Sequence, residues 1–215
     1  MTTLFVGIDR EEAIMASDSC LSLWKNGESF HQVSGFYKVN PVGKRMLVSA
    51  MGNHTFTMDI VNDLIAKGIN SPSTAADIFI ERCEKQEGQR RLCFNVLGVE
   101  NGRFVYYSGN GYDFENKKED IVKEGTAGLT KIPYEKEMLK ETSKGKCRMF
   151  YSQPFPSGMM AQQLAKEAQR TPIKKMANKF IKQIAVETNY KCHDDKTEIW
   201  ILPRKGSVYR WQYNN

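Results

Sequence analysis

The order of strand-like and helix-like segments constrains this fold more than any other feature of the sequence. Runs of β-branched and apolar residues predict strands, and apolar residues at helical spacing predict helices. The strands fall in three blocks separated by two pairs of helices: residues 3–51, 92–108 and 198–211 for the strands, and 56–83 and 161–186 for the helices. Because strands and helices come in blocks rather than in alternation, the pattern favours a layered α+β fold over repeated β-α-β units.

Short polar turns set the limits of several strands. Asp9–Glu12 joins two strand-like runs and predicts a hairpin, and Asn101-Gly102 is a strong signal for a two-residue hairpin turn. Three stretches are less regular. Residues 20–27 are predicted as a polar connection, Asn40–Gly43 as a turn, and residues 130–156 as a partly helical excursion.

The composition is that of an ordinary globular protein, with 40% hydrophobic and 26% charged residues among 215. These values exclude a disordered chain, a collagen-like chain and a coiled coil. No window approaches the roughly 18 apolar residues of a membrane-spanning helix, and the N-terminus lacks the pattern of a signal peptide. The five cysteines are scattered and form no Cys-x-x-Cys pair, which favours a reduced, cytoplasmic protein.

Part of the net charge of +6 lies in one helix-like region. Between Lys166 and Lys182 the only acidic residue is Glu167, among several lysines and an arginine. Such a stretch suits an acidic partner or nucleic acid. Charged helix faces are common in solution, however, so a solvated face is the preferred interpretation and nucleic-acid binding is not expected.

The sequence contains one dense cluster of potential metal ligands, formed by Cys192, His193, Asp194 and Asp195. A metal site usually combines ligand groups at a set spacing, and this cluster stands alone in a predicted loop. We interpret it as a polar turn and expect neither a metal nor another cofactor. Phosphate-binding glycine loops and the Gly-x-Ser-x-Gly and His-Glu-x-x-His catalytic motifs do not occur in the sequence.

The N-terminus offers a candidate nucleophile. The initiator Met1 is normally removed before a small residue such as Thr2, and its removal exposes a threonine with a free α-amine at the start of a strand. An unperturbed α-amine has a pKa of about 7.7–8.0, so it can take the proton of the Thr2 hydroxyl directly or through a water. Because many proteins begin Met-Thr, this feature alone decides little.

Three further residues strengthen this interpretation. Asp18 ends the second predicted strand, Lys38 lies in the next strand-like run, and Gly52 follows the long apolar strand. A lysine near Thr2 would lower the pKa of the α-amine, and Asp18 would hold that lysine by a charged hydrogen bond. The N–H of Gly52 is accessible to a developing oxyanion. Taken singly, Asp18 is better interpreted as a turn cap and Lys38 as a solvated strand residue.

In this arrangement the chain resembles the proteasome β-subunit and HslV-like family of N-terminal-nucleophile (Ntn) hydrolases. The likeness rests on segments that follow one another in order: Thr2–Val6, Ala13–Asp18, Tyr37–Val39, Leu47–Gly52, Asn101–Tyr107 and Gly125–Gly128. It covers residues 2–128 and resumes loosely from 158 to 202. The resemblance implies a four-layer αββα sandwich of two antiparallel sheets flanked by helices, formed by one domain, residues 1–215, with an insertion at about 129–156.

The resemblance also implies roles for the candidate residues. Thr2 would be the nucleophile and its α-amine the base, and the Gly52 N–H would form the oxyanion hole. Lys38 would tune Thr2 through its charge, with little effect on stability, and Asp18 would support Lys38.

The outer part of the active site is less well matched. The family's active-site serine falls on Thr126 or on Ser157, because both stand in a suitable context. Glu187 is the acidic residue nearest in position to the family's late aspartate.

The predicted function is that of a threonine-type peptidase that acts in a homo-oligomeric ring in the cytoplasm. Its substrates would be peptides or unfolded proteins, and an ATP-dependent unfoldase is a candidate partner. The alternatives are a catalytically silent scaffold or assembly subunit of the same fold, and a basic module that binds an acidic partner. A separate argument for a ring comes from Ile173–Val186, whose apolar residues span a broad arc that calls for a second covering surface.

Overall fold

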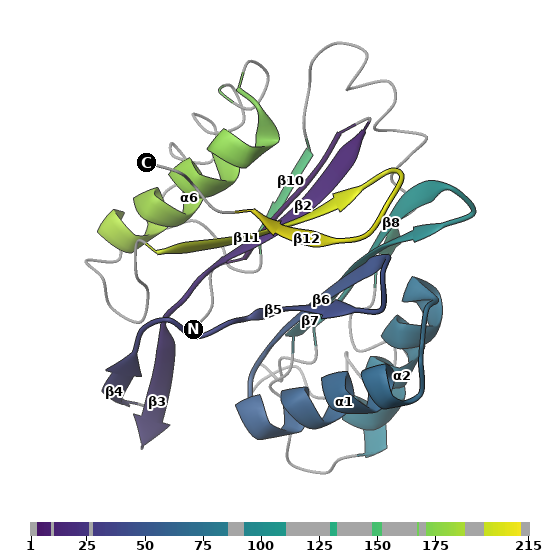
Figure 1. The fold of residues 1–215 in the computed structure, drawn as a ribbon. Helices are drawn as coiled ribbons and strands as arrows, with labels where there is room; N and C mark the ends of the chain where they lie inside the picture. Colours follow the sequence, from purple (N-terminus) through teal and green to yellow (C-terminus); the bar gives the residue numbers. More distant parts are fainter. Residues whose placement is uncertain are drawn as a thin grey trace. The chain divides into compact units, whose positions relative to one another are not determined.

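The computed structural model describes residues 4–9, 11–25, 28–85, 93–110, 130–132, 148–151, 167, 171–187 and 196–211. The chain forms two compact units; among the described residues, the first combines a sheet with the helix α6 (Ile173–Glu187) and the second a sheet with the helices α1 (His54–Ala66) and α2 (Pro72–Lys85) (Figure 1). The first unit comprises Met1–Val39, Lys136–Lys205 and Tyr209–Asn215, and the second comprises Asn40–Glu135 and Gly206–Val208.

The first unit is built on a five-stranded antiparallel sheet with the strand order β10-β1-β2-β11-β12. The strands are β10 (Arg148–Tyr151), β1 (Leu4–Ile8), β2 (Glu12–Asp18), β11 (Thr197–Pro203) and β12 (Tyr209–Trp211). All five residues of β1 are buried, so both faces of this strand are covered. A separate hairpin of β3 (Leu21–Lys25) and β4 (Glu28–Val33) follows β2.

Helix α6 (Ile173–Glu187) covers this sheet and contacts β1, β2 and β11. Its apolar positions recur at helical spacing and are buried against the strands; they are Ile173, Met176, Ala177, Phe180, Ile181 and Ile184. The ring of Phe180 packs on that of Phe5, with 5.6 Å between the centroids. The apolar arc of this helix is therefore buried within the chain, and it gives no separate argument for a ring.

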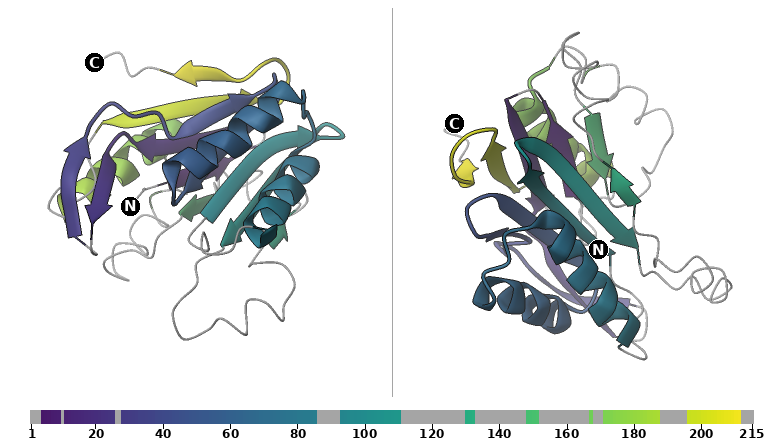
Figure 2. Two further views of the ribbon diagram at one scale, coloured as in Figure 1. Left: turned by 90° about the horizontal axis from the view of Figure 1, so that it is seen from below. Right: turned by 90° about the vertical axis from the view of Figure 1, so that its right-hand side faces the viewer.

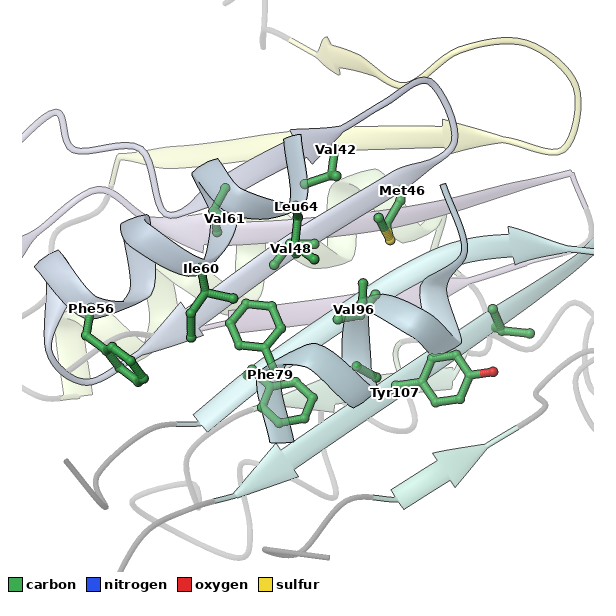
Figure 3. Close-up of a cluster of buried hydrophobic side chains, with 14 residues drawn as sticks. Val42, Met46, Val48, Phe56, Ile60, Val61, Leu64, Phe79, Val96 and Tyr107 are labelled. Atoms are coloured by element: carbon green, nitrogen blue, oxygen red, sulfur yellow. The ribbon is translucent and has the colours of Figure 1, made fainter. Parts of the chain in front are cut away.

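The second unit is also built on a five-stranded antiparallel sheet, with the strand order β5-β6-β7-β8-β9. The strands are β5 (Val39–Val42), β6 (Met46–Met51), β7 (Cys93–Glu100), β8 (Arg103–Asn110) and β9 (Thr130–Ile132). Helices α1 (His54–Ala66) and α2 (Pro72–Lys85) lie next to each other against it (Figure 2). The core forms where Phe56, Ile60 and Leu64 of α1 and Phe79 of α2 meet Val48 and Val96 of the sheet (Figure 3).

Both helices of the second unit begin with side chains that satisfy free backbone N–H groups. The Asn53 Oδ1 atom accepts from Phe56 N–H at 3.1 Å, and the hydroxyl oxygen of Ser71, placed directly before Pro72, accepts from Thr74 N–H at 3.3 Å. Glu100 at the end of β7 adds a carboxylate that accepts from Ser73 N–H at 2.7 Å. Among the described residues, none of the helices has the length and apolar character needed to cross a membrane.

Glu100 makes the second unit sensitive to acid. Burial raises the pKa of its carboxyl group, but hydrogen bonds from the backbone of Ser73 and the hydroxyl of Tyr107 outweigh burial and hold the pKa below its ordinary value. A depressed carboxyl pKa stabilises the fold above the unfolded-state pKa of about 4.3, and this contribution is lost as the pH falls through the folded-state value.

Glu100→Gln should therefore flatten the acid limb of the stability curve. At neutral pH we expect the variant to have an unfolding free energy about 1 kcal/mol below that of the wild type, the usual value of a helix cap. Below about pH 5, its unfolding free energy should fall less steeply with pH than that of the wild type. Urea unfolding at a series of pH values measures both quantities. An acid limb as steep in the variant as in the wild type would contradict this role.

Two of the predicted turns are confirmed. At the turn between β7 and β8, Asn101 has φ 51° and Gly102 has φ 76°, the left-handed pair that a two-residue hairpin of this type requires. At the turn between β1 and β2, the Asp9 carboxylate accepts from the N–H groups of Glu11 and Glu12 at 2.9 and 3.1 Å, which is how aspartate stabilises a turn.

Three other predictions were wrong. The predicted polar connection after β2 contains β3, the first strand of a hairpin. Asn40–Val42, predicted as a turn, is part of β5. Residues 130–132 and 148–151, predicted within a partly helical excursion, are the strands β9 and β10. These strands acquire their structure by pairing with β8 and β1, and no local periodicity reports such long-range pairing.

Candidate active site

A buried ion pair lies at the end of the central strand of the first unit. Asp18 is the last residue of β2, and Lys38 directly precedes β5. The Lys38 Nζ donates to Asp18 Oδ1 at 2.9 Å and to Oδ2 at 2.8 Å. The side chain of Lys38 is only 6% exposed and that of Asp18 only 1%. A pair so withdrawn from water interacts far more strongly than a surface pair and holds the ammonium group in one place.

The local structure of β2 places Asp18. This strand pairs with β1 as far as Ser17 and with β11 as far as Asp18, which lies opposite Thr197. The Asp18 Oδ2 atom also accepts from Cys20 N–H at 3.2 Å, which orients the carboxylate. The turn cap and the ion pair considered from the sequence are therefore both made by this one side chain.

Backbone hydrogen bonds hold the segment that carries Lys38. Ser19 accepts twice from it, through its carbonyl oxygen from Phe36 N–H at 2.9 Å and through its hydroxyl oxygen from Gly35 N–H at 3.0 Å. On the other side, the N–H of Lys38 donates to Glu198 Oε2 at 3.1 Å. Lys38 itself is 8% exposed, so it is not a solvated strand residue.

Glu198 was missed by sequence analysis. It lies in β11, is 3% exposed, and its Oε1 accepts from Trp200 Nε1–H at 2.6 Å. Burial raises the pKa of the Glu198 carboxyl, partly offset by the hydrogen bonds from Trp200 and the backbone of Lys38. The available signal was a lone acidic residue in the otherwise apolar strand Glu198–Leu202, because a charge is rarely buried without partners.

Gly52 lies in the second unit, at the turn between β6 and α1. Its φ of 131° is a backbone conformation that residues with a Cβ rarely adopt. The residue is exposed and directly precedes Asn53, the N-cap of α1. This conformation explains why a glycine is needed at this turn. Because glycine has no side chain, its own atoms do not shield its backbone N–H.

The remaining candidates fall at or beyond the limits of the described residues. Thr2, Thr126 and Ser157 lie outside them, as does the cluster Cys192–Asp195. Glu187 is the last residue of α6. No group of three or more histidine, cysteine or acidic side chains that could hold a metal occurs in the described part of the chain.

Comparison with known proteins identifies the fold. Neither a protein-family model nor a curated protein matches the sequence. Among solved structures, Anbu (ancestral β-subunit) from Yersinia bercovieri matches with a TM-score of 0.59 and 12% identity, covering 98% of this chain and 87% of that one. Eukaryotic HslV from Trypanosoma brucei matches with a TM-score of 0.59 and 11% identity, covering 94% and 99%.

The likeness extends over nearly the whole of each chain, and at this identity it concerns the fold. It confirms the predicted α+β sandwich, whose sheets and covering helices the two units display. On this evidence, the chain has the fold of the proteasome-like Ntn hydrolases.

Proposed function

We propose that this protein is an N-terminal threonine hydrolase, a cytoplasmic peptidase of proteasome type with Thr2 as its nucleophile. The observation that carries the proposal is the buried Asp18–Lys38 pair in a chain with the proteasome-like fold. The register of β1 adds support, since Leu4 pairs with Ser17, the neighbour of Asp18. Thr2 precedes Leu4 by two residues, and two residues span at most about 7 Å.

The proposed reaction needs no cofactor. The α-amine of Thr2 takes the hydroxyl proton as Oγ1 bonds to the substrate carbonyl carbon, whose oxygen becomes an oxyanion. The C–N bond then breaks, and the proton passes to the leaving amine, which leaves an ester on Thr2. A water, deprotonated by the same α-amine, hydrolyses the ester and frees the threonine.

Lys38 and Gly52 have separate roles in this proposal. The fixed ammonium of Lys38 disfavours protonation of the nearby α-amine and so keeps it available as a base. The N–H of Gly52 donates to the oxyanion. In the outer site, Thr126 or Ser157 supplies a hydroxyl group and Glu187 an acidic group.

Intact-mass spectrometry tests the proposal directly. The purified protein is expected to lack Met1 and to gain one equivalent of an electrophile that bonds to both the hydroxyl and the α-amine of an N-terminal threonine. A retained Met1 blocks the amine and would support the silent scaffold instead. Loss of Met1 without adduct formation would also contradict a catalytic role for Thr2.

We further propose that the protein assembles into a closed ring that encloses the Thr2 sites and admits substrates delivered by an ATP-dependent unfoldase. The whole-chain likeness to HslV and Anbu supports assembly, and closed symmetry is the usual form of soluble homo-oligomers. The apolar arc of α6 no longer contributes to this argument, because the first unit buries it.

Light scattering measures the assembly. We expect a molar mass of several chains of 24.6 kDa each, which stays the same on dilution. A mass of one chain at every concentration would contradict the ring and would favour a protein that acts alone.

A further inference from the structure

Glu198 links β11 to the segment that carries Lys38. One carboxylate oxygen accepts from Lys38 N–H and the other from Trp200 Nε1–H, and the backbone N–H of Val39 is a further donor to the carboxyl group. In the sheet, Glu198 lies opposite Ser17, and its neighbour Thr197 lies opposite Asp18. The Glu198 carboxylate therefore binds the backbone of Lys38, whose side chain binds Asp18. Asp18 lies one residue pair further along the two paired strands.

This arrangement is costly for a merely structural contact. The carboxyl group is almost fully buried, and its burial raises its pKa, so keeping it ionised opposes folding at neutral pH. The charged group whose attraction partly offsets this cost is Arg210, in β12. A neutral side chain would avoid the penalty, but none has two oxygens that accept N–H groups from both sides.

The backbone anchor matters because the lysine side chain is long and flexible. Four methylene groups separate Nζ from Cα, so the ammonium reaches one fixed point only if Cα is itself held in place. Ser19 anchors the segment at Gly35 and Phe36, and Glu198 anchors it at Lys38. Without Glu198, the nearest of these anchors on the N-terminal side of the lysine would be Phe36, two residues away.

We propose that Glu198 is a positioning residue, which fixes the Lys38 backbone so that the ammonium group stays on Asp18 at the point where the reaction needs its charge. The catalytic part of this inference rests on the proposed hydrolase function. The part that concerns the ion pair is independent of activity, which allows the two to be tested apart.

The first test is a double-mutant cycle measured by urea unfolding. Glu198→Gln keeps the shape of the side chain but replaces one acceptor oxygen with a donor group. It is introduced into the wild type and into a background with Asp18→Asn and Lys38→Met, where the ion pair is absent and no charge is stranded. If Glu198 positions Lys38, the substitution raises the unfolding equilibrium constant about tenfold more in the wild type than in that background.

Glu100→Gln is the matched control. Glu100 also accepts from a backbone N–H and an aromatic side chain, but it belongs to the other unit. Glu100→Gln should reduce the unfolding free energy by the same amount in both backgrounds. Equal effects of Glu198→Gln in both backgrounds would overturn the proposal and leave Glu198 as a structural contact.

The second test measures the reaction. Glu198→Gln is expected to slow covalent capture of the N-terminal electrophile by at least about tenfold, with little change in the concentration for half-maximal rate, because the substitution moves a charge and not a binding contact. A capture rate equal to that of the wild type would overturn the catalytic part. If the wild type itself captures nothing, the proposed function fails, while the unfolding cycle still decides whether Glu198 positions the ion pair.

Discussion

Thr2→Ala is expected to abolish peptide hydrolysis and covalent capture, with a fall in rate of about 10³-fold or more. Alanine is as small as the residues before which Met1 is removed, so the variant keeps the free α-amine and loses only the hydroxyl nucleophile. The unfolding free energy should stay within about 0.5 kcal/mol of the wild type. Rates of hydrolysis and adduct formation measured on the purified variant give the result.

Two controls make the Thr2 experiment specific. Thr2→Ser keeps a hydroxyl next to the α-amine and should retain activity, whereas Thr3→Ala removes the neighbouring hydroxyl and should leave the reaction intact. If Thr2→Ala hydrolyses peptides as fast as the wild type, the nucleophile lies elsewhere, and the proposed function would be wrong.

Lys38→Met should have a large effect on both activity and stability. The rate is expected to fall by orders of magnitude, because the α-amine loses the neighbouring charge that keeps it deprotonated. The unfolding free energy should fall by about 3–5 kcal/mol, because the Asp18 carboxylate, 1% exposed, would remain buried without its partner. The burial of the pair thus revises the sequence-based expectation that Lys38 contributes little to stability.

Combining Lys38→Met with Asp18→Asn separates the two effects. The double variant strands no charge, so most of the lost stability should return, while the activity should not. Urea unfolding and capture rates measured on the same samples provide the comparison. A double variant that regains activity would show that Lys38 serves folding and not catalysis.

Much of the architecture could be predicted where the signal is local. The Asn101-Gly102 turn follows from the backbone conformations that those residues tolerate, and the start of α1 follows from the capping side chain of Asn53. Asp18 and Lys38 were selected as partners from their positions at the ends of predicted strands and from the family resemblance, and the structure brings them together at 2.8 Å.

Other features depended on contacts that no short window of sequence contains. The strand β10 pairs with β1 near the other end of the chain, and its own four residues carry too little periodicity to predict it. Glu198 was missed for the same reason, since its partner Lys38 is separated from it by 160 residues. Only the folded chain shows that this acid has donors on both sides.

By itself, the sequence determined the blocks of strands and helices and the turns at Asp9–Glu12 and Asn101-Gly102, because neighbouring residues control backbone conformation directly. It also supplied a candidate nucleophile. The tertiary structure alone decided that Asp18 and Lys38 form a fully buried pair, that Glu198 anchors it, and that α6 buries its apolar arc within the first unit. Burial determines how strongly charges interact and how much free energy their removal from water costs. Burial is set by residues far away in the chain that only folding brings together.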